Sequence, residues 1–259
     1  MKSDSIRRCL PATLGVIALG ASMVLPATAH GAARTAPGAA VAGVSRIPFG
    51  VASDTYDGYA QLAAHESEGS DYRRVQRFPA RARVAHIAIH GGGIEAPTTQ
   101  LASHSASSRG FAYYSFEGIK KSGNGDLHIT SGRFDEPRAL KLVARVDYTV
   151  SWHGASGARP TTYVGGRDVA LIRRVTAELR AAGFTVAKFV PAEIAGRSPS
   201  NIANKNRRGK GVQLEISSGQ RERFFAGGRL NRSWIENPAN RTGAFYRYTA
   251  AVNRALAGL

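Results

Sequence analysis

The sequence predicts a single α/β domain built on a mixed, largely parallel sheet that is flanked by helices. Short apolar runs alternate along the chain with amphipathic helical patterns, and strands joined through helices tend to run parallel. No internal repeat is present, and about 210 residues of the mature chain are enough to bury one sizeable core. One domain is therefore the economical interpretation.

Several apolar runs have the length and residue types of buried strands. They span residues 84–89, 111–116, 145–152, 184–190 and 211–216. In a sheet of this kind, ligand sites are expected at the carboxyl ends of the strands. His90 and His153 directly follow two of these runs, so both should project from the same edge of the sheet.

The clearest helical pattern covers residues 167–182. One face carries its apolar side chains, Leu171, Ile172, Val175 and Leu179. Asp168 lies in the first turn, and Gly183 can adopt the left-handed conformation that ends a helix.

Two further helices are expected. Pro97 suits the first turn of a helix that extends through Leu101, and Thr242 can cap a helix near the end of the chain. The apolar stripe of that last helix consists of Phe245, Tyr248, Thr249, Val252 and Leu256.

Residues 1–29 have the pattern of a signal peptide. Basic residues precede an apolar run at 14–25, and Ala27-Thr28-Ala29 matches a signal peptidase site. This run is shorter than the roughly 20 residues that span a bilayer, so no stable membrane insertion is expected. A flexible segment, 30–47, then leads to the folded domain, 48–259, and the protein is expected to be secreted.

Cysteine usage restricts the chemistry of the mature chain. The only cysteine, Cys9, lies within the predicted signal peptide. The mature protein therefore has no disulfide or cysteine nucleophile, and any transition metal must be held by histidine and carboxylate side chains. Zinc suits such a site best.

The chain is strongly basic, with a net charge of +17. The predicted signal peptide has three basic residues and one acidic residue, so the mature chain keeps +15. Such a field concentrates polyanions near the protein, although charge can also serve solubility alone. No nucleic-acid module or aromatic stacking pattern is recognisable, so no specific nucleic-acid binding is expected. A monomer is expected.

The segment from His90 through three glycines to Glu95 is the most informative in the chain. The glycines allow a tight bend, which lets two side chains five positions apart converge on one point. With His153 as the third ligand, the set would match catalytic zinc sites that hold the metal with two histidines and one glutamate. Alternatively, the glycines form a simple turn and His153 bonds a carbonyl group.

The His-Gly-Gly-Gly pattern also occurs in the oxyanion loop of some esterases. That chemistry needs a serine elbow followed by an acid and then a histidine. The nearest elbow, around Ser156, lacks its final glycine, and no histidine follows His153. The order of residues therefore argues strongly against an esterase.

Glu215 stands inside an otherwise apolar strand pattern. A buried carboxylate is costly without a partner, so a function or an ion pair is expected. As a general base, Glu215 would accept a proton from the attacking water and return it to the leaving amine. The alternative is a structural ion pair with an arginine.

Substrate contacts are expected from two other segments. His128 lies in a polar cluster and can contact substrate or support a ligand, unless it is simply a solvated histidine. The basic run 204–210 precedes the strand of Glu215, and Arg207 or Arg208 could bind substrate carboxylates. A solvated basic loop is the alternative for this run.

These motifs together resemble the poly-γ-glutamate hydrolase family of phages and bacteria, in the family's order and over most of the mature chain. The motifs are His90-Gly-Gly-Gly-Ile-Glu95, Leu127-His-Ile-Thr-Ser131 with Phe134-Asp-Glu-Pro137, Ser151-Trp-His-Gly154 and Gly211-Val-Gln-Leu-Glu-Ile-Ser217. The chain departs from the family pattern at Ala203, where a cysteine is expected, and at Arg133, where a histidine is expected.

The resemblance implies a zinc-carboxypeptidase-like fold and one zinc ion held by His90, Glu95 and His153, with Glu215 as the catalytic carboxylate. It also implies cleavage of γ-glutamyl amide bonds in poly-γ-glutamate, a polyanion that suits a basic protein. Two alternatives stay open: hydrolysis of γ-glutamyl bonds in cell-wall peptides, and a non-catalytic protein that binds polyanions.

Overall fold

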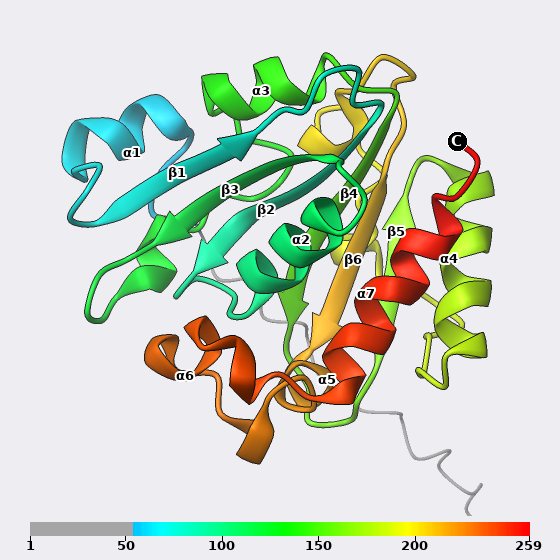
Figure 1. The fold of residues 1–259 in the computed structure, drawn as a ribbon. Coiled ribbons are helices and arrows are strands. Elements are labelled where there is room, and N and C mark those ends of the chain that lie inside the picture. Colours follow the sequence, from blue (N-terminus) through cyan, green and yellow to red (C-terminus); the bar gives the residue numbers. More distant parts are fainter. Residues whose placement is uncertain (1–53) are drawn as a thin grey trace, which may run out of the picture. The chain divides into compact units, whose positions relative to one another are not determined.

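The computed structural model describes residues 54–259, which form a six-stranded sheet with helices on both faces (Figure 1). The order of strands across the sheet is β1-β3-β2-β4-β6-β5. The predicted signal peptide, the segment 30–47 and the predicted domain start at residue 48 lie outside the described residues.

The sheet is mixed, with a parallel centre. Strands β3, β2, β4 and β6 run parallel, whereas β1 and β5 pair antiparallel at the two edges. The strands are β1 (Tyr72–Arg77), β2 (Val84–Gly92), β3 (Ala112–Gly118), β4 (Tyr148–Ala155), β5 (Thr162–Gly166) and β6 (Val212–Ser217). The predicted fold class, an α/β domain with a mixed and largely parallel sheet, is confirmed.

Helices cover both faces of the sheet, so two apolar clusters form (Figure 1). Along β2, Val84 and Ala88 pack in the cluster that contains α2, α4 and α7, whereas Ile87 and Ile89 pack in the cluster with α1 and α3. Burial on both faces explains the continuous apolar runs. The helices are α1 (Tyr59–His65), α2 (Thr98–Ser107), α3 (Pro137–Val143), α4 (Val169–Ala181), α5 (Ser218–Glu222), α6 (Arg232–Glu236) and α7 (Gly243–Ala255).

The predicted ends of α4 are reproduced, whereas those of α7 and α2 differ in detail. Asp168 caps α4 by accepting a hydrogen bond from the Leu171 N–H at 3.2 Å, and Gly183 follows with a φ of 85°. Thr242 occupies the N-cap position of α7, but its hydroxyl donates to the Arg223 carbonyl instead. Helix α2 begins at Thr98, so Pro97 occupies the N-cap position and not the predicted first turn, and the helix extends past Leu101 to Ser107.

The prediction of a strand at 184–190 is wrong. Val186 forms a single bridge with Thr162 beside the edge strand β5, and the chain then leaves the sheet. Phe184 and Val186 are buried in the core, which accounts for the apolar pattern, but Phe189 is 87 % exposed. The sequence pattern also missed both antiparallel edge strands, β1 and β5, whose residues are only partly apolar.

Among residues 54–259, no helix combines the length and the apolar character needed to cross a membrane.

Candidate active site

The turn between β2 and α2 brings Glu95 back beside His90. The Glu95 N–H donates to the His90 carbonyl at 2.9 Å, and the Thr98 hydroxyl donates to the same carbonyl at 3.2 Å. Gly92 has a φ of 62°, and a Cβ atom there would collide with the Gly118 carbonyl. Glycine is therefore required for the bend that joins the two side chains.

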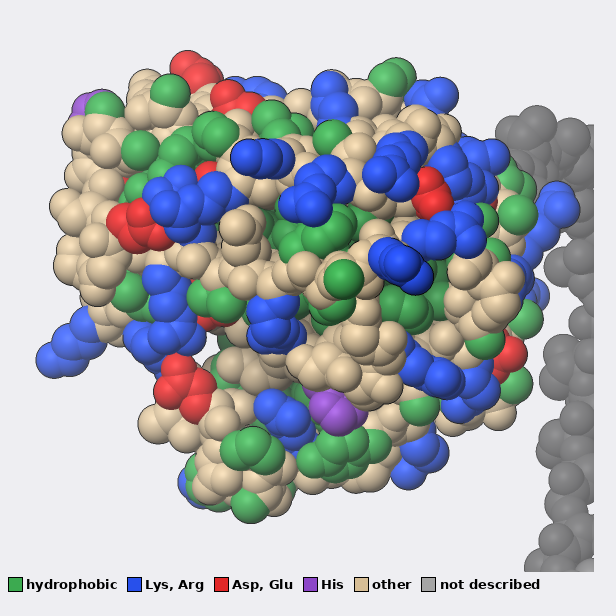
Figure 2. Space-filling view, turned by 45° about the horizontal axis from the view of Figure 1, so that its top comes forward, with side chains coloured by type: hydrophobic (Ala, Val, Ile, Leu, Met, Phe, Trp, Pro, Cys, Tyr) green, Lys and Arg blue, Asp and Glu red, His purple; other side chains and the backbone are tan. Residues whose placement is uncertain are grey.

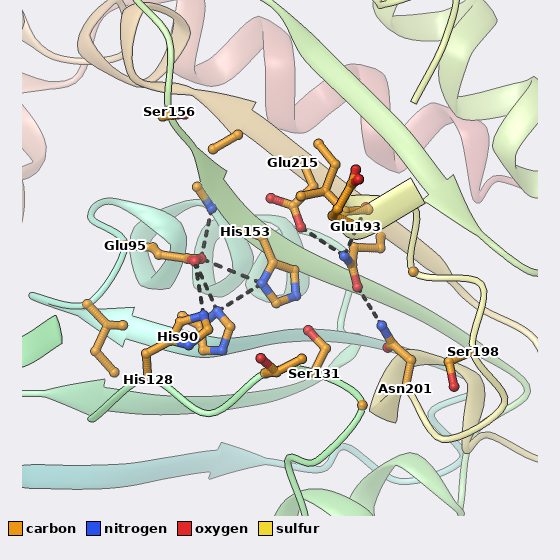
Figure 3. A pocket seen from close by; sticks show the side chains of 18 of the residues that line it. His90, Glu95, His128, Ser131, His153, Ser156, Glu193, Ser198, Asn201 and Glu215 are labelled. Carbon is orange, nitrogen blue, oxygen red and sulfur yellow. Dashed lines mark hydrogen bonds and ion pairs between the residues drawn. The ribbon is translucent and has the colours of Figure 1, made fainter. Parts of the chain in front are cut away.

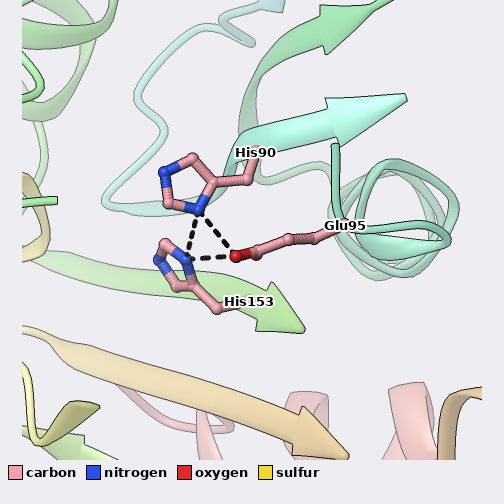
Figure 4. A group of neighbouring side chains, drawn as sticks. All are labelled: His90, Glu95 and His153. Atoms are coloured by element: carbon pink, nitrogen blue, oxygen red, sulfur yellow. Dashed lines mark hydrogen bonds and ion pairs between the residues drawn. The ribbon is translucent and has the colours of Figure 1, made fainter. Parts of the chain in front are cut away.

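His90, Glu95 and His153 converge on one point (Figure 4). The two Nδ1 atoms of the histidines are 3.0 Å apart. One Glu95 oxygen lies 3.1 Å from the Nδ1 of His90, and the other lies 3.5 Å from the Nδ1 of His153. The ligands come from β2, from the following turn and from β4, and β2 and β4 are neighbours in the sheet.

The three side chains are held in place by further contacts. The Nε2 of His90 lies 2.9 Å from the Ile129 carbonyl, and the Nε2 of His153 lies 2.7 Å from the Ser151 hydroxyl. The Gly154 N–H donates to Glu95 at 2.8 Å. Because a carbonyl can only accept, His90 carries its proton on Nε2 when neutral, and its Nδ1 presents a lone pair.

This donor set fits a divalent cation. Two imidazole nitrogens and a carboxylate oxygen lie within 4.8 Å of one another and face one point. Three protein ligands of these types, each fixed by an outer hydrogen bond, are typical of catalytic zinc sites. The three residues could therefore hold a metal ion.

Burial and charge set the protonation of the ligands. Burial raises the pKa of Glu95, but the neighbouring His90 and the hydrogen bonds from both histidines outweigh it, and the net pKa is well below the usual value. Burial lowers the pKa of His153, whereas at His90 the lowering by burial is outweighed by the charge and hydrogen bond of Glu95, so the pKa of His90 is raised. An ionised carboxylate and a neutral imidazole are the forms that bind metal.

Glu215 lies beside His153 in the sheet. The two residues are direct partners in the parallel pairing of β4 and β6, so their side chains project from the same face, and both line one cavity (Figure 3). The Gln213 amide donates to Glu215 at 2.8 Å. Burial and the negative charge of Glu95 raise the pKa of Glu215 well above its usual value. A bound cation would lower it.

His128 packs against His90, and the centroids of the two rings are 3.9 Å apart. Its Nδ1 lies 2.7 Å from the buried carboxylate of Asp54, and its Nε2 lies 3.8 Å from Glu95. Burial and the nearby His90 lower the pKa of His128 to about 4. The ring is therefore neutral near pH 7, with a proton on Nδ1 and an acceptor nitrogen toward the site.

These side chains line a cavity of about 420 Å³ (Figure 3). Its walls are formed by the ends of β2, β4 and β6, by the segment around His128 and by the segment around Glu193. The cavity thus contains His90, Glu95, His128, His153 and Glu215, five of the seven residues singled out in the sequence.

Arg207 and Arg208 do not line this cavity. Arg208 donates to Asp168 at 2.7 Å and lies 4.0 Å above the ring of Tyr148, while Arg207 is exposed beside Asp147. The basic run precedes β6, and a segment that precedes a strand lies at its amino end. Arg207 and Arg208, the arginines predicted to bind substrate carboxylates, therefore lie at the opposite edge of the sheet from the cavity.

Arg221 was not singled out in the sequence. Its guanidinium donates to the carbonyls of Ala96, Ala155 and Ile216, and its positive charge interacts with Glu95 and Glu215. A Cβ atom on residue 154 would approach this guanidinium to 2.8 Å, which explains the glycine after His153. The sequence offered one signal for Arg221, which is that this residue lies only four positions after the strand that carries Glu215.

Comparison with known proteins agrees with this geometry. The profile of the family described as poly-gamma-glutamate hydrolase matches residues 56–251. The UPF0714 protein YndL of Bacillus subtilis (strain 168) is 38 % identical over 207 residues, which cover 79 % of each chain.

Two solved structures are similar over nearly their whole length. A bacteriophage poly-gamma-glutamate hydrolase has 32 % sequence identity and a TM-score of 0.75, over 79 % of this chain and 97 % of its own. The zinc-free apo form of YndL has 36 % identity and a TM-score of 0.72, over 80 % of this chain and 98 % of its own.

Proposed function

Because the chain belongs to the poly-γ-glutamate hydrolase family, we propose that it is an exported, zinc-dependent enzyme that cleaves γ-glutamyl amide bonds of poly-γ-glutamate. One observation carries the proposal: three metal-binding side chains converge within 4.8 Å of one another, beside the buried carboxylate of Glu215, in one cavity. A metal site with an adjacent base is the arrangement that amide hydrolysis requires.

The residues that would hold the zinc ion are His90, Glu95 and His153. When bound, zinc would supply a Lewis acid that polarises the scissile carbonyl group and lowers the pKa of water. The zinc-free apo form of YndL is consistent with this choice of metal. His90 and His153 keep their ligand orientation through the Ile129 carbonyl and the Ser151 hydroxyl.

Glu215 would perform the proton transfers. Its carboxylate accepts a proton from the water that attacks the amide carbon, and it returns this proton to the nitrogen as the carbon–nitrogen bond breaks. The hydrogen bond from Gln213 fixes one oxygen of Glu215, which leaves the other oxygen for the proton. The acceptor nitrogen of His128 can bind an N–H group of the substrate.

The charge of the protein suits a polyanionic substrate. Lys and Arg side chains are spread over the face shown in Figure 2, with few acidic side chains between them. Such a surface raises the local concentration of poly-γ-glutamate. The predicted signal peptide would deliver the enzyme outside the cell, where the polymer is present.

Replacement of Glu215 by Gln tests the catalytic assignment. E215Q keeps the size of the side chain but removes the base, so we expect hydrolysis of poly-γ-glutamate to fall by about 100- to 10,000-fold. Chain length of the polymer is followed by size-exclusion chromatography, and zinc content is measured on the same samples. Unchanged zinc with lost hydrolysis supports the proposal.

The same experiment separates the enzyme from a polyanion-binding protein. A non-catalytic binding protein would leave the polymer intact even with the wild-type chain and a full complement of zinc. Equal hydrolysis by E215Q and the wild type would instead show that Glu215 is not the base.

A further inference from the structure

The segment 192–198 forms one wall of the cavity and presents two charged side chains, Glu193 and Arg197. Both side chains are exposed, and neither has a hydrogen-bond or ion-pair partner among residues 54–259. An arginine without a protein partner at the mouth of a catalytic cavity is available to a ligand. This segment did not stand out in the sequence pattern.

The backbone of this segment is fixed by neighbouring elements. The Ala195 carbonyl accepts from the Gly166 N–H at 2.7 Å, and the Gly196 carbonyl accepts from the Asn204 amide at 2.9 Å. The Gln213 amide donates to the Ile194 carbonyl at 3.2 Å while it also holds Glu215. Gln213 therefore connects the wall that carries Arg197 to the proposed catalytic carboxylate.

The charged side chains of the cavity lining are mostly acidic, although the proposed substrate is itself a polyanion. Glu95, Glu193 and Glu215 all line it, and Arg197 is the only Lys or Arg among the described lining residues. Every residue of poly-γ-glutamate carries a free α-carboxylate next to the bond that is cut. Without Arg197, no lysine or arginine of the lining could pair with that carboxylate, and its repulsion from the three glutamates would weaken binding.

We propose that Arg197 binds the α-carboxylate of a substrate glutamyl residue and so determines specificity for γ-linked polyglutamate. This inference rests on the proposed function. A guanidinium matches a carboxylate through two parallel hydrogen bonds, which a lysine cannot reproduce. Glu193, on the same wall, opposes binding of the polyanion and limits the position that the carboxylate can occupy.

Three single substitutions with different expected signs test this assignment. R197A should raise the KM for poly-γ-glutamate on the order of 10- to 100-fold, with a much smaller change in kcat, because a charge-assisted hydrogen bond is lost. E193Q should lower KM because a repulsive charge is removed. R197K should have a KM between those of R197A and the wild type.

Arg207 provides the matched control. It is an exposed arginine like Arg197, it was the candidate from the sequence, and it lies outside the cavity. R207A should keep the KM of the wild type. A rise in KM for R207A without one for R197A would overturn the inference and restore the basic run as the substrate contact. A rise in KM for E193Q would show that Glu193 contacts a cationic group, and this would also overturn it.

Direct binding separates this inference from the proposed function. Titration of a short γ-glutamyl oligomer into E215Q, E215Q/R197A and E215Q/R207A, followed by calorimetry, measures affinity without turnover. We expect weaker binding only in the R197A background. If the wild type cleaves the polymer but R197A binds and cleaves normally, this inference alone fails. If the wild type neither cleaves nor binds the polymer, both fail.

Discussion

Charged residues lie at both ends of the central parallel strands, but only those at the carboxyl ends line the cavity. At the carboxyl ends of β2 and β4, His90, Glu95 and His153 are packed together at the floor of a cavity. At the amino ends of β4 and β6, Arg207 pairs with Asp147 at the surface, and Arg208 pairs with the buried Asp168. The comparison shows that strand direction decides which charged residues can meet.

The geometry of parallel strands explains this difference. Residues that follow parallel strands all emerge at one edge, and residues that precede them emerge at the other. The Arg207 N–H donates to the Val146 carbonyl just before β4, which places the basic run at the amino edge. Glu215 lies within β6, and its pairing with His153 brings it to the active edge.

Loss of a metal ligand should have the largest effect at the carboxyl end. In H153A, only two of the three ligands remain, so we expect zinc content to fall well below one ion per chain and activity to fall by more than about 1,000-fold. Zinc is measured by elemental analysis after dialysis. H65A is the control, because His65 is exposed and does not line the cavity.

Full zinc content and activity in H153A would contradict the claim that the metal site needs ligands from both β2 and β4. Removal of zinc from the wild type by a chelator should give the same loss of activity as H153A. Added zinc should restore activity to the wild type alone.

Loss of the Gln213 side chain should have an intermediate effect. Q213L removes the hydrogen bonds to Glu215 and to the Ile194 carbonyl, and we expect about a 10- to 100-fold lower kcat/KM. The hydrogen bond from Gln213 lowers the pKa of Glu215. Its loss should raise that pKa, so the acidic limb of the pH–rate profile should move to higher pH.

The pH profile distinguishes positioning from general damage to the fold. A variant that is merely less stable would lose activity without a shift of the acidic limb. Q213E is a useful companion, because a second negative charge beside Glu215 should shift the limb to higher pH as well. An unshifted limb in both variants would show that Gln213 does not act on Glu215.

The smallest effect on activity is expected at the amino end. Asp168 is buried, caps α4 and binds Arg208 at 2.7 Å. R208A leaves that carboxylate without its charged partner, so the free energy of unfolding should fall by about 1–3 kcal/mol. Both kcat and KM should stay at wild-type values. Denaturant unfolding measures the free energy of unfolding, and initial rates measure kcat and KM.

R207A is the control for R208A, because its ion pair is longer and more exposed, and it should cost less than about 1 kcal/mol. A change in KM for R208A would show that the amino end takes part in substrate binding. The comparison between the two ends would then no longer hold.

Much of the fold could be predicted from the sequence because local patterns encode it. The central strands are buried on both faces, so their apolar runs are continuous, and α4 has a capping aspartate and a terminal glycine. The edge strand β1 lacks that pattern because it is largely exposed, whereas β5 is mostly buried but consists of Thr, Tyr, Val and two glycines. Residues 184–190 share the pattern because Phe184 and Val186 reach the core without forming a strand.

The sequence by itself determined which groups were available: two histidines and a glutamate as candidate metal ligands, a carboxylate in an apolar strand, and no cysteine after Cys9. The short spacing of His90 and Glu95 even determined their proximity, since glycines close the turn between them. Tertiary structure alone decided how distant segments meet. The neighbouring positions of β2, β4 and β6 unite His153 and Glu215 with that turn.

Tertiary structure also decided which arginines serve the site. Arg221 reaches beneath Gly154, and Arg197 reaches the cavity wall, because their segments fold against the carboxyl edge of the sheet. Arg207 and Arg208 belong to a more conspicuous basic run, yet strand direction places them at the other edge. The charge of each residue can be read from the sequence. The edge of the sheet at which a charged residue lies depends on the direction of its strand and on the neighbouring strands.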